Sequence, residues 1–121
     1  MAYNPEFEEF LLLKRAEGRE RFSDFWEFSS GFVEENESVK DAALRELQEE
    51  KGLTGEIIRT GESFDIEGAE LVLHPVLVKV SEDEVKVSRE HSKYNWVEKD
   101  RLEEFQTVPR LGKDLQKLGI D

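Results

Sequence analysis

The chain has 121 residues, a formal net charge of −12 at pH 7 and no cysteine. This length suits one domain over residues 1–121 with its own core, and a chain without cysteine forms neither disulfides nor zinc–cysteine sites. No apolar stretch is long enough to span a membrane, and no leader pattern opens the chain, so we expect a cytoplasmic protein without a membrane partner. A chain with this negative charge would repel nucleic acid, so we expect no nucleic-acid partner. If the protein binds phosphate groups, a divalent cation would have to lie between the phosphates and its carboxylates.

Short apolar runs separated by polar residues open the chain. Phe10 to Lys14 predicts a buried strand, Trp26 to Phe28 a second short extended segment, and Arg15 to Asp24 a loop between them. From Ser38 to Lys51 the apolar residues recur at three- and four-residue steps, which predicts a helix. Ser38 is placed to cap its beginning, and Gly52 to end it.

The second half of the chain predicts further strands and two terminal helices. Gly61 and Glu67-Gly68 mark turns between the strands, and Thr107 is placed to cap the last helix. The expected strands cover 57–59, 63–66, 71–80, 85–87 and 94–97, and the expected helices cover 100–105 and 109–118. The sequence therefore predicts an α/β fold with a mixed sheet and helices packed against it.

The predicted helix ends in a cluster of carboxylates. Glu46, Glu49 and Glu50 fall within about 100° of one another around a helix, so we expect their side chains to converge. Hard divalent cations such as Mg²⁺ or Mn²⁺ prefer oxygen ligands of this kind, whereas the alternative is a solvated acidic face. Arg45 precedes Glu49 by four residues, which is the less stabilising order for a surface pair and favours a role in orienting a ligand.

The spacing around this cluster matches a known motif. Gly31, five residues, Glu37, seven residues and then the run from Arg45 to Leu53 fill every fixed position of the Nudix box, so the chain resembles the Nudix hydrolases. Similar segments occur outside the box at 11–15 (LLLKR), 25–34 (FWEFSSGFVE) and 90–97 (EHSKYNWV). The resemblance implies an α/β/α sandwich whose first strand is abbreviated here, and an uncovered strand edge of that kind allows a homodimer.

The resemblance also implies roles for individual residues. Glu46, Glu49 and Glu50 would be ligands of Mg²⁺ or Mn²⁺, together with the carbonyl group of Gly31. Arg45 would hold Glu49 in place, and Glu37 and Gly52 would be structural residues of the motif. The general base varies among relatives, which leaves Glu46 and Glu90 as candidates.

Three further residues are candidates with an alternative interpretation. Arg15 would contact a phosphate of the substrate or be a plain surface charge, and Trp26 would face the substrate or belong to the core. His91 would contact the substrate or have a structural role.

The implied activity is that of a metal-dependent, MutT-like Nudix pyrophosphohydrolase. Its small-molecule substrate would be a nucleoside triphosphate, cut to the monophosphate and pyrophosphate, and the segments at 25–38 and 89–97 look most like the branch that acts on dATP and dihydroneopterin triphosphate. The alternatives are a dinucleoside polyphosphate or nucleotide-sugar hydrolase, and a non-catalytic Nudix-fold module that binds nucleotides.

Overall fold

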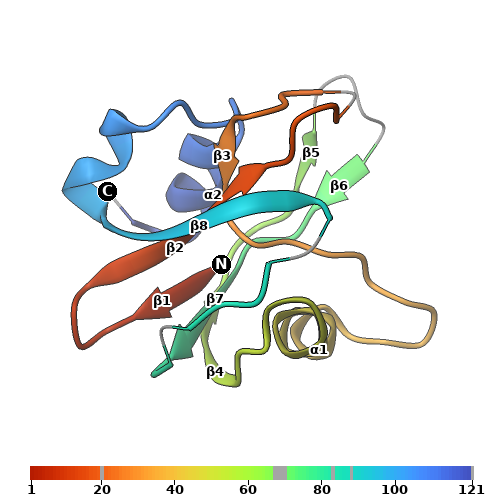
Figure 1. The fold of residues 1–121 in the computed structure, drawn as a ribbon. Coiled ribbons are helices and arrows are strands. Elements are labelled where there is room, and N and C mark those ends of the chain that lie inside the picture. The colour runs from red at the N-terminus through yellow and green to blue at the C-terminus, as the bar shows by residue number, and fades with distance from the viewer. Residues whose placement is uncertain (20, 67–70, 83, 88, 121) are drawn as a thin grey trace.

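The longest shared ladder of the sheet pairs β2 (Glu9–Arg15) with β8 (His91–Glu98), as the computed structural model shows in Figure 1. The structure describes residues 1–19, 21–66, 71–82, 84–87 and 89–120. Along its other edge, β2 pairs with β3 (Trp26–Glu27) near Leu13 and with the first of three further strands near Phe10. Those strands are β1 (Ala2–Asn4), β7 (Val76–Val80) and β4 (Gly55–Thr60). The sheet is mixed because β1 runs parallel to β7, whereas its other pairings are antiparallel.

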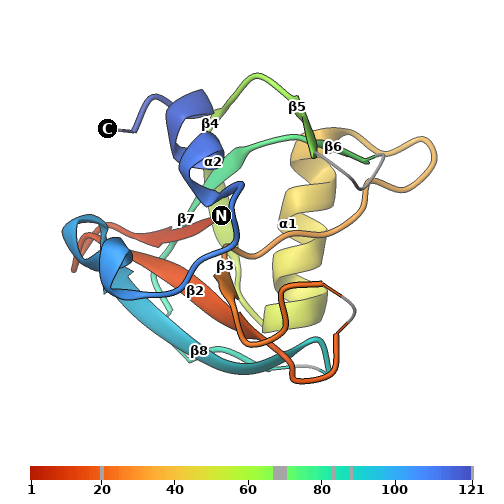
Figure 2. The same cartoon turned by 90° about the horizontal axis from the view of Figure 1, so that it is seen from above.

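Alternate residues of β2 supply two cores, one on each face of the sheet. Leu11 and Leu13 pack with Leu47 of α1 (Val39–Lys51), whereas Phe10 and Leu12 pack with residues of the C-terminal segments. These segments are the 3₁₀-helix η1 (Lys99–Glu104) and α2 (Leu111–Lys117), and they lie on the side of the sheet away from α1 (Figure 2). Two helical layers around one sheet confirm the predicted α/β/α sandwich.

The helix α1 begins and ends where the sequence predicts. The hydroxyl group of Ser38 accepts a hydrogen bond of 3.1 Å from the backbone N–H of Asp41, which satisfies one of the free donors of the first turn. Gly52 ends the helix with a φ angle of 70°, a left-handed conformation that costs glycine little. These caps fix the ends of the segment that carries the clustered glutamates.

The N-terminal strand agrees with the prediction, whereas the central strand differs from it. β1 is present as a three-residue strand, so the first strand is abbreviated as expected. The single strand predicted over 71–80 is wrong, because the chain breaks at His74 and Pro75 into β6 (Leu71–Leu73) and β7. Proline has no N–H to offer a ladder, and β6 instead pairs with β5 (Phe64–Ile66) in a separate two-stranded sheet.

The predicted strand over 85–87 is also wrong. Val85 is buried in the core beside α1, but its neighbour Lys86 donates its backbone N–H to the carbonyl group of Lys51 rather than to a strand. The turn predicted at Glu67-Gly68 lies outside the described residues.

The C-terminal helices differ from the prediction, the first in type and the second in length. The first is a 3₁₀-helix, and α2 begins at Leu111 without a side-chain cap, so the expected cap at Thr107 is wrong. Thr107 is instead engaged in a parallel bridge with Trp26, which ties the segment before α2 to β3. Among the described residues, no helix is long and apolar enough to cross a membrane.

Candidate active site

Arg45 connects α1 to the loop that precedes it. Its Nε lies 2.7 Å from Oε2 of Glu37, and its Nη2 donates to the carbonyl group of Phe32 at 2.9 Å. Its Nη1 donates to Oε1 of Glu46 at 3.0 Å and to Oε2 of Glu49 at 3.2 Å. The hydrogen bond to Glu37 is the main reason that the pKa of Arg45 is raised, and the same bond lowers the pKa of Glu37. One guanidinium group therefore fixes both the loop and two of the clustered carboxylates.

The loop passes very close to the side chain of Glu46. A β-carbon added to Gly31 would collide with Cγ and Cδ of Glu46 where that side chain now lies, so any other residue at this position would displace the carboxylate. Gly31 therefore brings loop backbone next to a candidate ligand.

The donor atoms of this region suit a hard divalent cation, since the glutamates and the loop backbone offer only oxygen. Glu46, Glu49 and Glu50 all lie on α1, and among the described residues no three acidic, histidine or cysteine side chains are grouped as a metal-ligand set. Arg45 draws Glu46 and Glu49 to its guanidinium group, and the side chain of Glu49 is 61% exposed. The chemistry of these donors fits Mg²⁺ or Mn²⁺.

A cavity of about 720 Å³ lies beside this segment and is lined by charges of both signs. Carboxylates of Glu46 and Glu50 come from α1, and Glu90 comes from the loop before β8. The cavity also has basic residues, which are Arg15, Arg19, Arg21, Lys51 and Arg110. Although the whole chain has a charge of −12, these cations create a region that is able to receive an anion.

Glu27, which the sequence did not single out, organises the basic side of the cavity. Its Oε1 accepts hydrogen bonds from Arg15 at 2.9 Å and from Arg110 at 2.7 Å, and its Oε2 lies 2.7 Å from Nε2 of His91. Burial alone would raise the pKa of Glu27, but the hydrogen bond from His91 and the charges of both arginines outweigh burial and lower the pKa. Glu27 is therefore an ionised buried carboxylate that orients several cations.

Lys51, at the end of α1, extends this arrangement. It is 4% exposed, and its Nζ lies 3.2 Å from Nδ1 of the buried His91. Burial lowers the pKa of Lys51, and the nearby charges of Glu50, Glu90, Glu27 and Glu46 oppose that effect. The structural interpretation of His91 thus accounts for both of its ring nitrogens.

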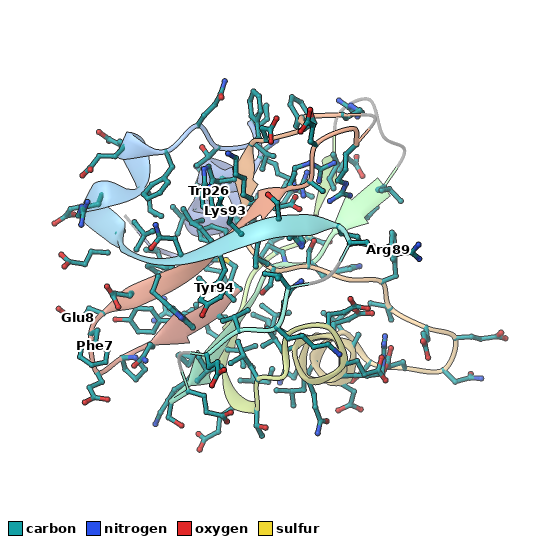
Figure 3. All side chains as sticks on the ribbon, in the orientation of Figure 1. Phe7, Glu8, Trp26, Arg89, Lys93 and Tyr94 are labelled. Carbon is teal, nitrogen blue, oxygen red and sulfur yellow. The ribbon has the colours of Figure 1, made fainter. Side chains whose placement is uncertain are left out.

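The structure distributes the other predicted residues between the cavity and the core. Arg15 lines the cavity, but it donates to Glu27 and to the carbonyl group of Arg21. Glu90 is exposed and lines the cavity. Trp26 packs edge-on against Phe105 with ring centroids 5.3 Å apart. It shares the face opposite α1 with Lys93 (Figure 3), so the structure does not bring it to the cavity.

The cavity residues that the sequence did not indicate include Glu27, Lys51, Arg110 and Asp114. For two of these residues, the sequence contains a feature that indicates an inward-facing charge. Glu27 is a charge between two aromatic residues of a predicted strand, and Lys51 follows Leu47 by four residues on the inward stripe of the helix. Asp114, whose pKa burial raises to about 6, and Arg110 had no such signal.

The comparisons with known proteins agree with this geometry. The family model described as NUDIX domain matches residues 2–118, so the chain belongs to the Nudix family, and it is a hydrolase of phosphoric anhydride bonds. The chain is similar to the nucleoside triphosphatase NudI of Escherichia coli O139:H28, with 32% identity over 92% of this chain and 88% of that protein.

Solved structures show the same fold. A MutT protein from Methanosarcina mazei Go1 superimposes with a TM-score of 0.74 and 28% identity over 94% of this chain and 83% of that chain. An Ap4A hydrolase from C. elegans, solved as a binary complex, gives a TM-score of 0.76 and 26% identity over 98% of this chain and 91% of that chain.

Proposed function

We propose that this Nudix hydrolase is a metal-dependent pyrophosphohydrolase that cuts a nucleoside triphosphate to the monophosphate and pyrophosphate. The observation that carries the proposal is one cavity whose lining combines Glu46 and Glu50 of α1 with the arginines that contact Glu27. A polyphosphate fits such a cavity, because its negative charge can be shared between a cation held by carboxylates and the arginine side chains. The similarity to a nucleoside triphosphatase supports this substrate class.

The residues that would hold Mg²⁺ or Mn²⁺ are Glu46, Glu49 and Glu50, with the carbonyl group of Gly31. When bound, the cation would neutralise the phosphate chain and so favour attack by water on phosphorus. Arg45 contributes by positioning, because it ties Glu46 and Glu49 to the loop that carries Gly31.

The other steps fall to side chains of the cavity. Arg15 and Arg19 would bind phosphate oxygens, with Glu27 orienting Arg15. Glu90 or Glu46 would take a proton from the attacking water, whose oxygen bonds to phosphorus while the anhydride bond between the α- and β-phosphates breaks. The leaving group is pyrophosphate, and the products are the nucleoside monophosphate and pyrophosphate.

The first experiment is a substrate panel with product analysis. Purified protein is incubated with nucleoside triphosphates, dihydroneopterin triphosphate, ADP-ribose and diadenosine polyphosphates in Mg²⁺ or Mn²⁺, and the products are separated by chromatography. We expect pyrophosphate and a monophosphate from a triphosphate. Inorganic phosphate with a nucleoside diphosphate would contradict the proposed bond cleavage.

Substitutions at the carboxylates test the metal requirement. Glu49→Gln and Glu50→Gln should each lower kcat by about a thousandfold or more without unfolding the protein, since an amide is a poor ligand for a hard cation. Near-normal turnover by both variants would contradict the assignment of the ligands.

A second pair of variants separates the candidates for the general base. If Glu90 is the base, Glu90→Gln lowers kcat and removes the acidic limb of its pH profile, while Mn²⁺ affinity is retained. If Glu46 is the base, Glu46→Gln lowers kcat and removes the acidic limb of its pH profile. This variant also weakens Mn²⁺ binding, because Glu46 is a proposed ligand.

A dinucleoside polyphosphate is a second candidate substrate. Its support is the structural similarity to the Ap4A hydrolase, which extends over 98% of this chain. Two nucleotide products from diadenosine tetraphosphate, formed faster than pyrophosphate from any triphosphate, would favour this alternative.

A further inference from the structure

The buried ammonium group of Lys51 is unusual in its surroundings. Lys51 directly follows Glu50 at the end of α1, yet its side chain points inward and contacts His91. Among the described residues it forms no ion pair, although a buried lysine is normally paired with a carboxylate because desolvating an unpaired charge is costly. Packing alone does not explain a charge at this position, since an apolar side chain would fill it at lower cost.

The contact with His91 does not neutralise this charge. A protonated lysine can only donate hydrogen bonds, so Nδ1 of His91 must accept, and Nε2 must carry the hydrogen that is donated to Glu27. His91 therefore offers the ammonium group a lone pair and no negative charge, and the charge of Glu27 is already shared between Arg15 and Arg110. His91 holds the ammonium group in place without adding a negative charge, and the charges that act on Lys51 are those of Glu50, Glu90, Glu27 and Glu46.

The other carboxylates near Lys51 belong to the proposed metal site and to the candidate general base Glu90. Glu46, Glu50 and Glu90 line the same cavity as Lys51. A fixed positive charge beside them reduces the negative potential that attracts a divalent cation, and the effect is larger in a partly buried cavity than in water.

We propose that Lys51 is a built-in cation of the active site that weakens the binding of divalent metal ions by the glutamates of α1. This inference rests on the proposed function, because it concerns the metal site assigned there. The inference goes beyond that function in one respect. Lys51 would supply part of the positive charge that faces the phosphates and would lower the affinity of the glutamates for the metal ion.

The test is a titration with Mn²⁺ in the absence of substrate, followed by the electron paramagnetic resonance of free Mn²⁺ and by calorimetry. Lys51→Gln keeps a donor for His91 but removes the charge, and Lys51→Met removes both. We expect each variant to bind Mn²⁺ about tenfold more tightly than wild type, since a repulsive charge has been removed. Lys51→Arg, which retains the charge, should not bind more tightly.

The matched control is Lys40→Gln, an exposed lysine in the first turn of the same helix, which should bind Mn²⁺ as wild type does. Circular dichroism identifies any variant that fails to fold, and either Lys51→Gln or Lys51→Met is sufficient for the comparison. Unchanged or weaker Mn²⁺ binding in the folded Lys51 variants would overturn the role of Lys51.

Glu50→Gln distinguishes this failure from a failure of the proposed function. Loss of Mn²⁺ binding in Glu50→Gln places the measured ion at the glutamates, so that the Lys51 variants report on that site. If Glu50→Gln binds Mn²⁺ as wild type does, the metal site itself is wrongly assigned, and the role of Lys51 is overturned with it.

Discussion

Glu27 and His91 are 64 residues apart in the sequence, but Oε2 of Glu27 and Nε2 of His91 lie 2.7 Å apart in the protein interior. Glu27 comes from β3 and His91 from the first position of β8, and β2 lies between these strands. Because Arg15 of β2 and Arg110 also donate to Glu27, one carboxylate joins the sheet to the segment before α2. Glu27 therefore orients three other residues that line the cavity, which come from separate parts of the chain.

Removing the charge of Glu27 should destabilise the protein. Glu27→Gln leaves Arg15 and Arg110 without their shared carboxylate in a largely buried place, so we expect a loss of about 3 kcal/mol in the free energy of unfolding. Urea denaturation measures this loss. Glu104→Gln, which removes the exposed partner of Arg101, is the control and should leave the stability unchanged.

The same carboxylate should make stability depend on acid. The pKa of folded Glu27 is below its ordinary value of 4.5, so its contribution to stability is complete above that pH and is lost as the pH falls through the folded pKa. We expect the stability of wild type to fall more steeply than that of Glu27→Gln below about pH 4.5. Parallel curves for the two proteins in thermal unfolding between pH 3 and pH 6 would contradict this prediction.

Gly31→Ala should impair the site without unfolding the protein. The added methyl group collides with Glu46, whose flexible side chain can move away, so the fold is retained while the carboxylate is displaced. We expect kcat/KM to fall about a hundredfold, because small displacements of catalytic groups have effects of that size. The control is Gly112→Ala in α2, where an added β-carbon meets nothing within 4 Å and activity should be unchanged.

Arg45→Lys should lower activity although it retains the charge. A lysine cannot make the forked contacts that Arg45 makes with Glu37, Glu46 and Phe32, so the loop and the glutamates lose their common support. We expect kcat to fall by about a hundredfold, with a weaker response to Mg²⁺ concentration. Arg101→Lys on η1 alters an exposed pair with Glu104 and should have normal kinetics, and equal kinetics for both variants would refute a positioning role for Arg45.

Asp114→Asn should stabilise the protein at neutral pH. Burial raises the pKa of Asp114 from 3.8 to about 6, so its favourable contribution is complete below pH 3.8 and is lost as the pH rises through about 6. We expect the variant to be more stable than wild type by about 2 kcal/mol above pH 7 and equally stable near pH 4. Thermal unfolding at both pH values measures the difference, with the exposed Asp100→Asn as the control.

Local patterns were reliable where one segment determines its own structure. The apolar spacing, the Ser38 cap and the Gly52 terminus of α1 depend on neighbours within four residues, and all three were predicted correctly. The strand predicted over 71–80 is wrong because the apolar residues on both sides of Pro75 suggested one continuous strand. The predicted Thr107 cap is wrong because Thr107 forms a bridge with Trp26.

The sequence by itself determined the Nudix motif, the helix that carries its glutamates and the layered fold, because these depend on spacing along the chain and on the burial of apolar faces. Only the tertiary structure decided that Glu27 gathers Arg15, Arg110 and His91, and that Lys51 turns inward to His91. These groups come from separate elements, and a charged side chain is buried only where partners from elsewhere in the chain reach it. Contacts between residues this far apart in the sequence cannot be predicted from a local pattern.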